Sequence, residues 1–310
     1  MSPAVIRVTF LGTAASRPTV GRNVSGLAVQ REGDLLLFDC GEGTQRQMMR
    51  YGTGFGVDAI FVTHMHADHF LGITGLLRTL GLQGREEPLE LYGPPGSRAT
   101  LEVLVHLGAE RIPFPVPIRQ LGDGDAVQRD GYRVVAFAVD HGVQAVGFAL
   151  VEDERLGRFD VERARALGVP EGPLFGKLHR GQPVQVDGRT IDPSDVVGPS
   201  RAGRRIVYTG DTKAARGTVA IARCADLLVH DCTFSEEEAD RAEETCHATA
   251  LGAARTAAAA GARRLYLTHI SARYAENPRA LEEEAAAVFP GARVAQDGLV
   301  LEIPFADKDD

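Results

Sequence analysis

The chain has 310 residues, of which 44% are hydrophobic and 25% are charged, and its formal net charge is −8. This length supports a sizeable core in one large domain or two small ones. The acidic balance argues against a protein that coats nucleic acid through bulk charge alone. No apolar run reaches the roughly 18 residues of a membrane span, and the N-terminus has no signal-peptide pattern. None of the four cysteines forms a C-x-x-C pair, so we expect a cytoplasmic protein with free thiols.

Short apolar runs bounded by turn residues predict β-strands along most of the chain. They occupy residues 5–12, 26–30, 34–41, 59–64, 89–93, 132–141, 145–151, 205–211, 227–231, 264–269 and 299–305. Apolar residues near a period of 3.6 predict helices within 70–84, 97–109 and 249–264. Because helices fall only between some of the strands, we expect two sheets with helices packed outside, rather than a strictly alternating parallel sheet.

Residues 152–195 break this rhythm, because charged residues, glycine and proline replace the apolar runs. One short helix is predicted in "DVERARALG", with Gly168 as its C-terminal stop. The segment lies between two strands that belong to the core by their composition. We interpret it as an insertion that projects from the body; the alternative is a long disordered loop.

A dense histidine cluster follows the predicted strand that ends near residue 62. The sequence "FVTHMHADHFLG" places His64, His66, Asp68 and His69 within six residues. His64 and His66 are two positions apart, so in extended backbone they face the same way. Nitrogen and oxygen ligands of this kind suit zinc or another borderline divalent metal. A surface turn that happens to be rich in histidine is the alternative interpretation.

Three further candidate ligands stand at the ends of other predicted strands. They are His141 in "FAVDH", Asp211 in "VYTGD" and His269 in "YLTH". Each alone would more often be an ordinary turn or core residue. Together with the cluster they make seven ligands, too many for one tetrahedral zinc. They suit two metals if one carboxylate bridges them, and Asp211 is the carboxylate available outside the cluster.

The order of "THMHADH", an isolated histidine, "GDT" and "LTHIS" resembles the metallo-β-lactamase superfamily. That resemblance implies an α/β fold, a four-layer αβ/βα sandwich with a dinuclear zinc site at its rim. By the same analogy, Asp39 in "DLLLFDCGEG" supports the metal-binding loop from outside the ligand set. The superfamily contains several hydrolase types, so the fold alone does not decide the function.

Further motifs resemble the tRNase Z family of tRNA 3′-processing endonucleases. The loop "SRPTVGRNVS" is similar to that family's P-x-K-x-R-N loop, and "RFDVERARALGVPEGPLFGKL" is similar to its flexible arm. The segments "HDCT" and "HAT" stand where the family has H-E-A-T and H-S-T. Val20 replaces the usual lysine of the N-terminal loop, which leaves discrimination against CCA open. The resemblance therefore implies precursor tRNA as substrate and a homodimer as the assembly.

The resemblance also implies a role for each residue at a matching position. His64, His66 and His141 would hold one zinc, Asp68, His69 and His269 a second, and Asp211 would bridge the two. Asp68 would also accept a proton from the attacking water. His247 would be the general acid for the tRNA 3′-oxygen, with His230 and Asp231 in support. The expected RNA contacts are Arg22, Asn23, Gly172, Pro173, Lys177 and Arg273.

Residues 1–151 and 196–310 would then form the catalytic domain, and residues 152–195 a flexible tRNA-binding arm. The expected reaction removes the 3′ trailer after the discriminator base, leaving a 3′-hydroxyl on the tRNA and a 5′-phosphate on the trailer. Another hydrolase on the same scaffold is the nearest alternative, such as a small-substrate phosphodiesterase, an arylsulfatase or a thioesterase. A metal-dependent RNA-binding protein without catalysis is the alternative from another class.

Overall fold

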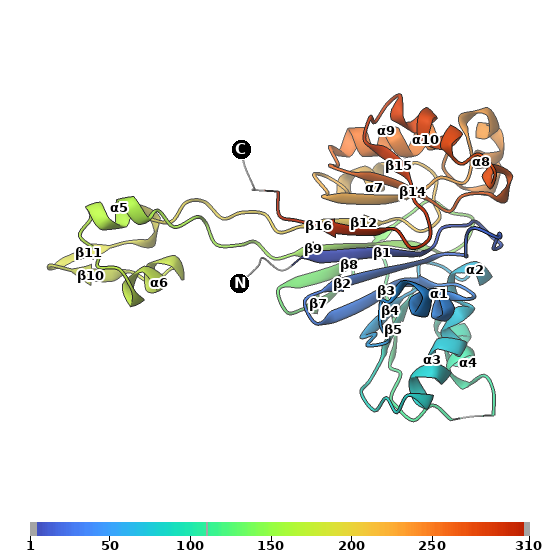
Figure 1. Ribbon diagram of the computed structural model, residues 1–310, viewed down its shortest axis with the longest axis horizontal. Helices are drawn as coiled ribbons and strands as arrows, with labels where there is room; N and C mark the ends of the chain where they lie inside the picture. Colours follow the sequence, from blue (N-terminus) through green and yellow to red (C-terminus); the bar gives the residue numbers. More distant parts are fainter. Residues whose placement is uncertain (1–4, 110, 307–310) are drawn as a thin grey trace. The chain divides into compact units, whose positions relative to one another are not determined.

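Two seven-stranded mixed sheets form the larger of the two compact units of the chain (Figure 1). A computed structural model describes residues 5–109 and 111–306. The first sheet has the order β16-β1-β2-β3-β4-β5-β6. Its strands are β1 Ile6–Gly12, β2 Gly26–Arg31, β3 Asp34–Cys40, β4 Ala59–Phe61, β5 Glu90–Gly93, β6 Ile118–Gln120 and β16 Val300–Ile303. From β3 to β6 the neighbouring strands are parallel, so the ends of β3 and β4 lie at one edge of this sheet.

The second sheet has the order β15-β14-β13-β12-β9-β8-β7. Its strands are β7 Ala126–Arg129, β8 Tyr132–Ala138, β9 Val146–Glu152, β12 Arg205–Tyr208, β13 Leu227–Asp231, β14 Leu265–Thr268 and β15 Ala292–Val294. The four strands from β12 to β15 run parallel, and β9 pairs antiparallel with β12. Parallel pairing brings the carboxyl ends of β12, β13 and β14 together, which is where polar loops can converge.

Helices cover the outer faces of both sheets (Figure 1). The core of the first sheet includes buried side chains from α1 Thr44–Tyr51, α3 Gly72–Leu82 and α4 Arg98–His106. The core of the second includes those of α9 Ala250–Ala260 and α10 Arg279–Ala286, with α7 Arg216–Ile221 packed against α9. Two short helices, α2 Ala67–Phe70 and α8 Ala239–Thr245, and the 3-10 turns η2 Glu236–Glu238 and η3 Ala272–Tyr274 complete this part.

Helix α9 is capped at both ends. The Thr249 side chain accepts a hydrogen bond from the Gly252 amide at the start of the helix. At its end Gly261 adopts a left-handed conformation with φ +61°, which glycine takes without a steric cost. The buried face of α9 includes Ala250, Ala253, Ala254, Ala257 and Ala260, and the helix confirms the prediction for residues 249–264.

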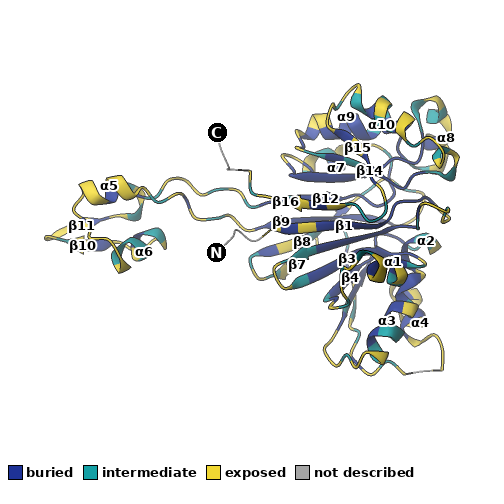
Figure 2. Cartoon of the chain, viewed as in Figure 1, coloured by how far each residue is buried: buried dark blue, intermediate teal, exposed yellow. Residues whose placement is uncertain are grey.

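Aromatic side chains join the two sheets face to face. Phe148 of β9 packs against Phe38 of β3 and Phe61 of β4, with ring centroids 5.9 and 5.3 Å apart. Figure 2 shows that the sheets are mostly buried, while exposed residues gather on the outer helices and loops. The order of layers is helix, sheet, sheet, helix, which confirms the predicted four-layer sandwich.

A second compact unit is formed by Asp130–Tyr132 and Glu152–Gly203. It contains α5 Val161–Ala166, α6 Pro173–His179, the hairpin of β10 Val184–Val186 and β11 Arg189–Ile191, and the 3-10 turn η1 Pro193–Asp195. Its own small core includes Ala164, Leu178 and Ile191. The segment is therefore folded, and the alternative of a disordered loop is wrong. The unit continues to Gly203 because backbone bridges pair Arg155 with Arg201 and Phe159 with Val197.

Among the described residues, no helix has both the length and the apolar character needed to cross a membrane.

Candidate metal centre

The seven predicted ligands follow strands of both sheets, and two of them, Asp68 and His69, lie in the short helix α2. His64, His66, Asp68 and His69 follow β4, and His141 follows β8. Asp211 follows β12, and His269 follows β14. The structure brings all seven side chains into one cluster at the strand ends.

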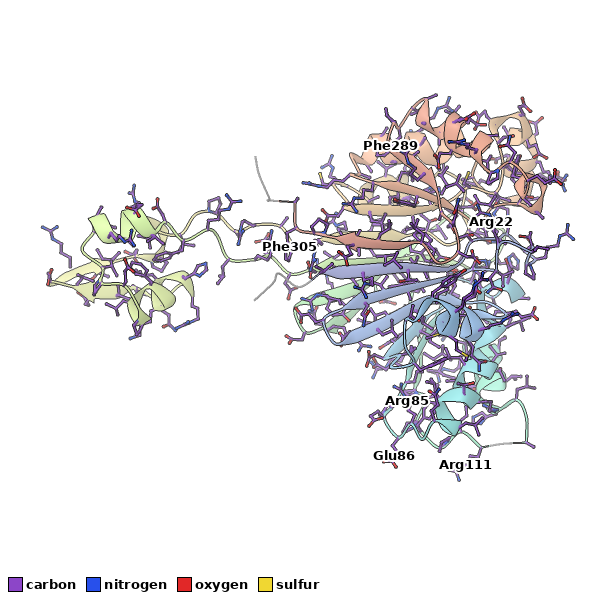
Figure 3. The ribbon with its side chains drawn as sticks, viewed as in Figure 1. Arg22, Arg85, Glu86, Arg111, Phe289 and Phe305 are labelled. Atoms are coloured by element: carbon purple, nitrogen blue, oxygen red, sulfur yellow. The ribbon has the colours of Figure 1, made fainter. Side chains whose placement is uncertain are left out.

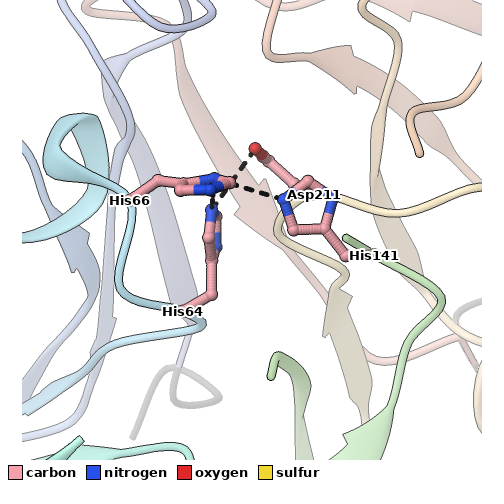
Figure 4. Close-up of side chains that lie close together, drawn as sticks. All are labelled: His64, His66, His141 and Asp211. Carbon is pink, nitrogen blue, oxygen red and sulfur yellow. Dashed lines mark hydrogen bonds and ion pairs between the residues drawn. The ribbon is translucent and has the colours of Figure 1, made fainter. Parts of the chain in front are cut away.

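The first group of ligands contains His64, His66, His141 and Asp211 (Figure 4). The His66 Nδ1 atom lies 3.0 Å from His64 Nε2 and 3.3 Å from His141 Nε2. The distance from His64 Nε2 to Asp211 Oδ2 is 3.5 Å. A tetrahedral zinc with bonds of about 2.0–2.1 Å places its ligand atoms about 3.3 Å apart. The spacing of these four ligand atoms therefore fits a zinc ion.

The second group contains Asp68, His69 and His269, and it also reaches Asp211. Asp68 Oδ2 lies 3.4 Å from His69 Nε2 and 3.3 Å from His269 Nε2. Asp211 Oδ2 lies 3.2 Å from His269 Nε2, and Asp211 Oδ1 lies 3.4 Å from His69 Nε2. Asp211 is thus the carboxylate in contact with both groups. Its Oδ1 and the His69 Nε2 are buried without a hydrogen-bond partner, as atoms that ligate a metal would be.

Hydrogen bonds fix the ring orientation of four of these histidines. The Thr63 hydroxyl donates its proton to Asp39, and the Thr233 hydroxyl donates its proton to Asp231. Each hydroxyl oxygen therefore accepts from the neighbouring imidazole: from His64 Nδ1 at 3.0 Å and from His269 Nδ1 at 2.9 Å. His141 Nδ1 donates to the carbonyl oxygen of Cys246 at 3.0 Å. His69 Nδ1 donates to Asp39 at 2.7 Å. Each ring therefore presents Nε2 to the centre, which is how outer partners orient metal-ligating histidines.

Asp39 supports the centre without being a ligand. It is fully buried and has a left-handed backbone with φ +58°, a conformation that non-glycine residues rarely adopt. Besides His69, its carboxylate accepts hydrogen bonds from the Thr63 amide, the Thr63 hydroxyl and the Tyr208 hydroxyl. The predicted position of Asp39 outside the ligand set matches these contacts.

Charge in the cluster favours cations. Burial opposes ionisation of Asp211, but His269, His69 and His64 outweigh it and hold the pKa of the carboxyl well below its usual range. Burial lowers the pKa of His64 well below its ordinary value. A buried carboxylate beside a neutral imidazole is a donor set that binds a divalent metal.

Beside the ligands stands a second carboxylate–imidazole pair. His247 Nδ1 donates to Asp231 Oδ2 at 2.8 Å, and Asp231 is fully buried. Burial opposes the charge on His247, but Asp231 outweighs it and raises the pKa of the imidazole to about 9. Asp231 also accepts hydrogen bonds from the amides of Thr212 and Thr233 and from the Thr233 hydroxyl. Because its oxygens are occupied by these donors, we place Asp231 outside the ligand set.

The structure does not bring His230 to this cluster. Its neighbour on β13, Asp231, points toward His247, and successive residues of a strand point to opposite faces. His230 is fully buried, and its Nδ1 donates to the backbone carbonyl of Asp231 at 2.8 Å. Burial lowers the pKa of its imidazole. The side chain that contacts His247 is therefore Asp231, and the His230 side chain does not take part as the sequence predicted.

The expected RNA contacts have different environments. Arg22 (Figure 3) is buried and donates to the Thr13 hydroxyl and the carbonyl of Ala295 at 2.6 and 2.5 Å, so its guanidinium holds the protein's own backbone. Asn23 donates from its side chain to the carbonyl of Glu42 at 2.9 Å. Neither group is free to bind RNA directly in this structure, because both already bind other atoms of the protein.

The other expected contacts are more accessible. Arg273 is exposed and pairs with Glu238 at 2.7 Å. Gly172, Pro173 and Lys177 are exposed residues at and within α6 of the second compact unit. Gly172 has φ +121° at the start of that helix, a conformation that favours glycine.

Sequence reasoning missed the support that Thr63 and Tyr208 give to the ligands through Asp39. Thr63 precedes His64, and Tyr208 lies three residues before Asp211, so proximity to a ligand was the available signal. It also missed Ser16, whose amide donates to Asp68 Oδ2 at 2.9 Å across a separation of 52 residues. No local pattern predicts that long-range contact.

Comparison with known proteins assigns this arrangement to a class. The profile of the Metallo-beta-lactamase superfamily matches residues 19–257. Human tRNase Z, short form, has a similar structure, with a TM-score of 0.70, 28% identity, and coverage of 96% of this chain and 100% of that chain. A diphosphatase of the PhnP family has a TM-score of 0.63 at 21% identity, which shows the shared fold alone. The chain belongs to the metallo-β-lactamase superfamily, and its His/Asp cluster fits a metal-binding site.

Relatives with similar sequences identify the family within this superfamily. A Ribonuclease Z of Myxococcus xanthus is 58% identical over 98% of this chain and 100% of its own length. A Ribonuclease Z of Haloferax volcanii is 54% identical over 98% of this chain and 97% of its own length. The chain belongs to the ribonuclease Z family.

Proposed function

We propose that this chain is a zinc-dependent endoribonuclease that removes the 3′ trailer from precursor tRNA. The cut falls 3′ of the discriminator base and leaves a 3′-hydroxyl on the tRNA and a 5′-phosphate on the trailer. The observation that carries the proposal is the complete cluster of seven ligand side chains on a chain 58% identical to a Ribonuclease Z.

The ligand groups support two zinc ions per chain. His64, His66 and His141 would hold one ion, Asp68, His69 and His269 the other, and Asp211 would be shared. When bound, zinc lowers the pKa of water to about 7 and offsets the negative charge of a phosphate. The remaining chemistry comes from side chains of this protein.

We assign the two proton transfers to Asp68 and His247. The Ser16 amide holds Asp68 Oδ2 at 2.9 Å, and this carboxylate accepts the proton of the attacking water. His247, kept cationic by Asp231, donates a proton to the 3′-oxygen of the tRNA as that oxygen leaves. A general acid of this kind contributes roughly 10²–10⁴ in rate.

The RNA contacts are proposed to come mainly from the second compact unit and from Arg273. Gly172, Pro173 and Lys177 are exposed there and can meet the tRNA backbone. Arg22 and Asn23 act indirectly, because they hold the loop of residues 13–24 in place. Val20 is fully exposed on that loop and offers no cation to a CCA end.

Replacement of residues 154–202 by a short glycine–serine linker tests this role of the second unit. We expect cleavage of precursor tRNA to be lost while hydrolysis of bis(p-nitrophenyl) phosphate continues, because the ligands all lie outside the deleted segment. If the shortened protein still cleaves precursor tRNA at the native rate, the second unit does not bind the substrate.

We also propose that the enzyme is cytoplasmic and that it is a homodimer. Sedimentation at micromolar concentration would test the homodimer.

The decisive experiment for the function is incubation with precursor tRNAs, with and without an encoded CCA, and mapping of the cut. A cut directly after the discriminator base supports the proposal. Failure to cleave either substrate with zinc present rules it out.

A further inference from the structure

A cavity of about 450 Å³ adjoins the candidate general acid. His247 lines it, and Thr233, which holds the ring of His269, lines it as well. None of the lining residues in the described part of the chain is acidic. The remaining lining residues are Ala15, Ser16, Arg17, Phe234, Arg241, Thr245, Ser271, Ala272 and Arg273.

Three arginines from separate segments meet at this cavity. Arg17 belongs to the N-terminal loop, Arg241 to α8 and Arg273 to η3, and all three are exposed. Arg273 pairs with Glu238. No described carboxylate forms an ion pair with Arg17 or Arg241. In a protein whose net charge is −8, two unneutralised guanidinium groups in one cavity indicate an anionic ligand.

Phe234 restricts two of these arginines. It is buried at 5% exposure, and the guanidinium carbons of Arg241 and Arg273 lie 5.9 and 5.8 Å from the centre of its ring. Guanidinium groups at this distance are attracted to the ring. Arginine side chains drawn to this ring lose less conformational entropy when they bind a ligand than freely moving ones.

We propose that this cavity holds the nucleotide on the 5′ side of the cut and that Arg241 and Arg17 bind its 5′-phosphate. The inference rests on the proposed function, in which His247 protonates the 3′-oxygen of that nucleotide. The sugar that carries this oxygen must therefore lie beside His247, in the cavity that His247 lines. The volume suits one nucleotide, and guanidinium groups match the oxygens of a phosphate.

Adenosine 5′-monophosphate is the simplest probe, because it has the 5′-phosphate and the free 3′-hydroxyl of the product's terminal nucleotide. Its binding to the zinc-loaded protein is compared with that of adenosine by calorimetry. We expect the phosphate to strengthen binding by at least about 10-fold, as charge-assisted hydrogen bonds do. In Arg241→Gln and in Arg17→Gln, this advantage should fall to within about 3-fold.

Arg279→Gln is the matched control, because Arg279 is an exposed arginine that does not line the cavity. This variant should keep the full phosphate advantage. Zinc content and thermal unfolding of each variant establish that the fold and the metal centre are intact. Arg17 lies on an exposed loop, so its variant tests the inference even if Arg241→Gln fails to fold.

Two results would overturn the inference. One is equal binding of the nucleotide and the nucleoside to the unmodified protein. The other is a phosphate advantage that persists in both cavity variants, which would mean that the phosphate binds the zinc ions instead. If precursor tRNA is still cut after the discriminator base, either result removes the cavity assignment and leaves the proposed function standing.

Discussion

Two carboxylate–imidazole pairs, each with its imidazole next to the ring of His269, have nearly the same local geometry. Asp39 accepts from His69 Nδ1 at 2.7 Å, and Asp231 accepts from His247 Nδ1 at 2.8 Å. Both carboxylates are fully buried. Each also accepts hydrogen bonds from the amide and the hydroxyl of one threonine, Thr63 for Asp39 and Thr233 for Asp231.

The pairs differ in what surrounds the second ring nitrogen. His69 is fully buried, and its Nε2 lies 3.4 Å from carboxylate oxygens of Asp68 and Asp211. His247 has 13% of its side chain exposed and lines an open cavity. Under the proposed function, the same kind of pair would orient a metal ligand in one place and supply a proton donor in the other, according to the surroundings of Nε2.

Asp211→Asn should have the largest effect, because it removes charge from the ligand side of this comparison. Asn keeps the shape but not the negative charge that offsets two divalent ions. We expect zinc affinity to fall by more than the roughly 10–100-fold typical of losing an outer partner, and tRNA cleavage to fall to background. Metal analysis of the purified variant and circular dichroism test this. A variant that keeps two zinc ions and native activity would contradict a shared carboxylate.

His247→Ala tests the proton-donor side of the comparison. Cleavage of precursor tRNA should slow by roughly 10²–10⁴, because the 3′-oxygen is a poor leaving group without a proton. Hydrolysis of bis(p-nitrophenyl) phosphate should fall much less, since nitrophenolate leaves without protonation. Equal losses on both substrates would show that His247 supports the metal centre and is not an acid.

Asp39→Asn, compared with Asp231→Asn, tests which of the two pairs contributes more to zinc affinity. An amide at this buried position would point donors at Thr63, Tyr208 or His69, which costs about 1–3 kcal/mol for each donor left unpaired. We expect zinc affinity to fall by roughly 10–100-fold, measured by competition with a chelator. Asp231→Asn is the comparison variant and should lose less zinc affinity, because Asp231 supports one ligand, His269, and does so only through the Thr233 hydroxyl. Zinc loss of equal size in both variants would remove the distinction between the pairs.

The clustering of the seven candidate ligands was predictable from sequence because their signal is local. His64, His66, Asp68 and His69 lie within six residues, and His141, Asp211 and His269 each end an apolar run. The strands that carry them were predictable for the same reason, since each apolar run contains a strand of the structure. The strands β6, β7 and β15 were not predicted, because charged and amide side chains interrupt their apolar residues. The helix α6 has seven residues, which is too few to show a clear period of 3.6.

The buried roles of particular side chains were not predictable in the same way. Nothing in "GRNVS" indicates that Arg22 turns inward to the carbonyl of Ala295, 273 residues away. His230 and Asp231 are adjacent in the motif, yet the strand directs them to opposite faces. Partners distant in sequence become visible only when the fold brings them together.

Asp231→Asn should have the smallest effect, a shift in the pH dependence of cleavage of precursor tRNA. Asp231 raises the pKa of His247 from an ordinary 6.5 to about 9, so the imidazole stays protonated at neutral pH. The stability from this pair is fully present below the unfolded pKa of 6.5 and is lost as pH rises through about 9. In the variant the pKa falls, and the alkaline limb of kcat/KM for precursor tRNA should move to lower pH. The profile for bis(p-nitrophenyl) phosphate, which needs no acid, serves as the control. A limb that stays in place, or that moves equally for both substrates, would mean that His247 does not donate the proton whose pKa Asp231 controls.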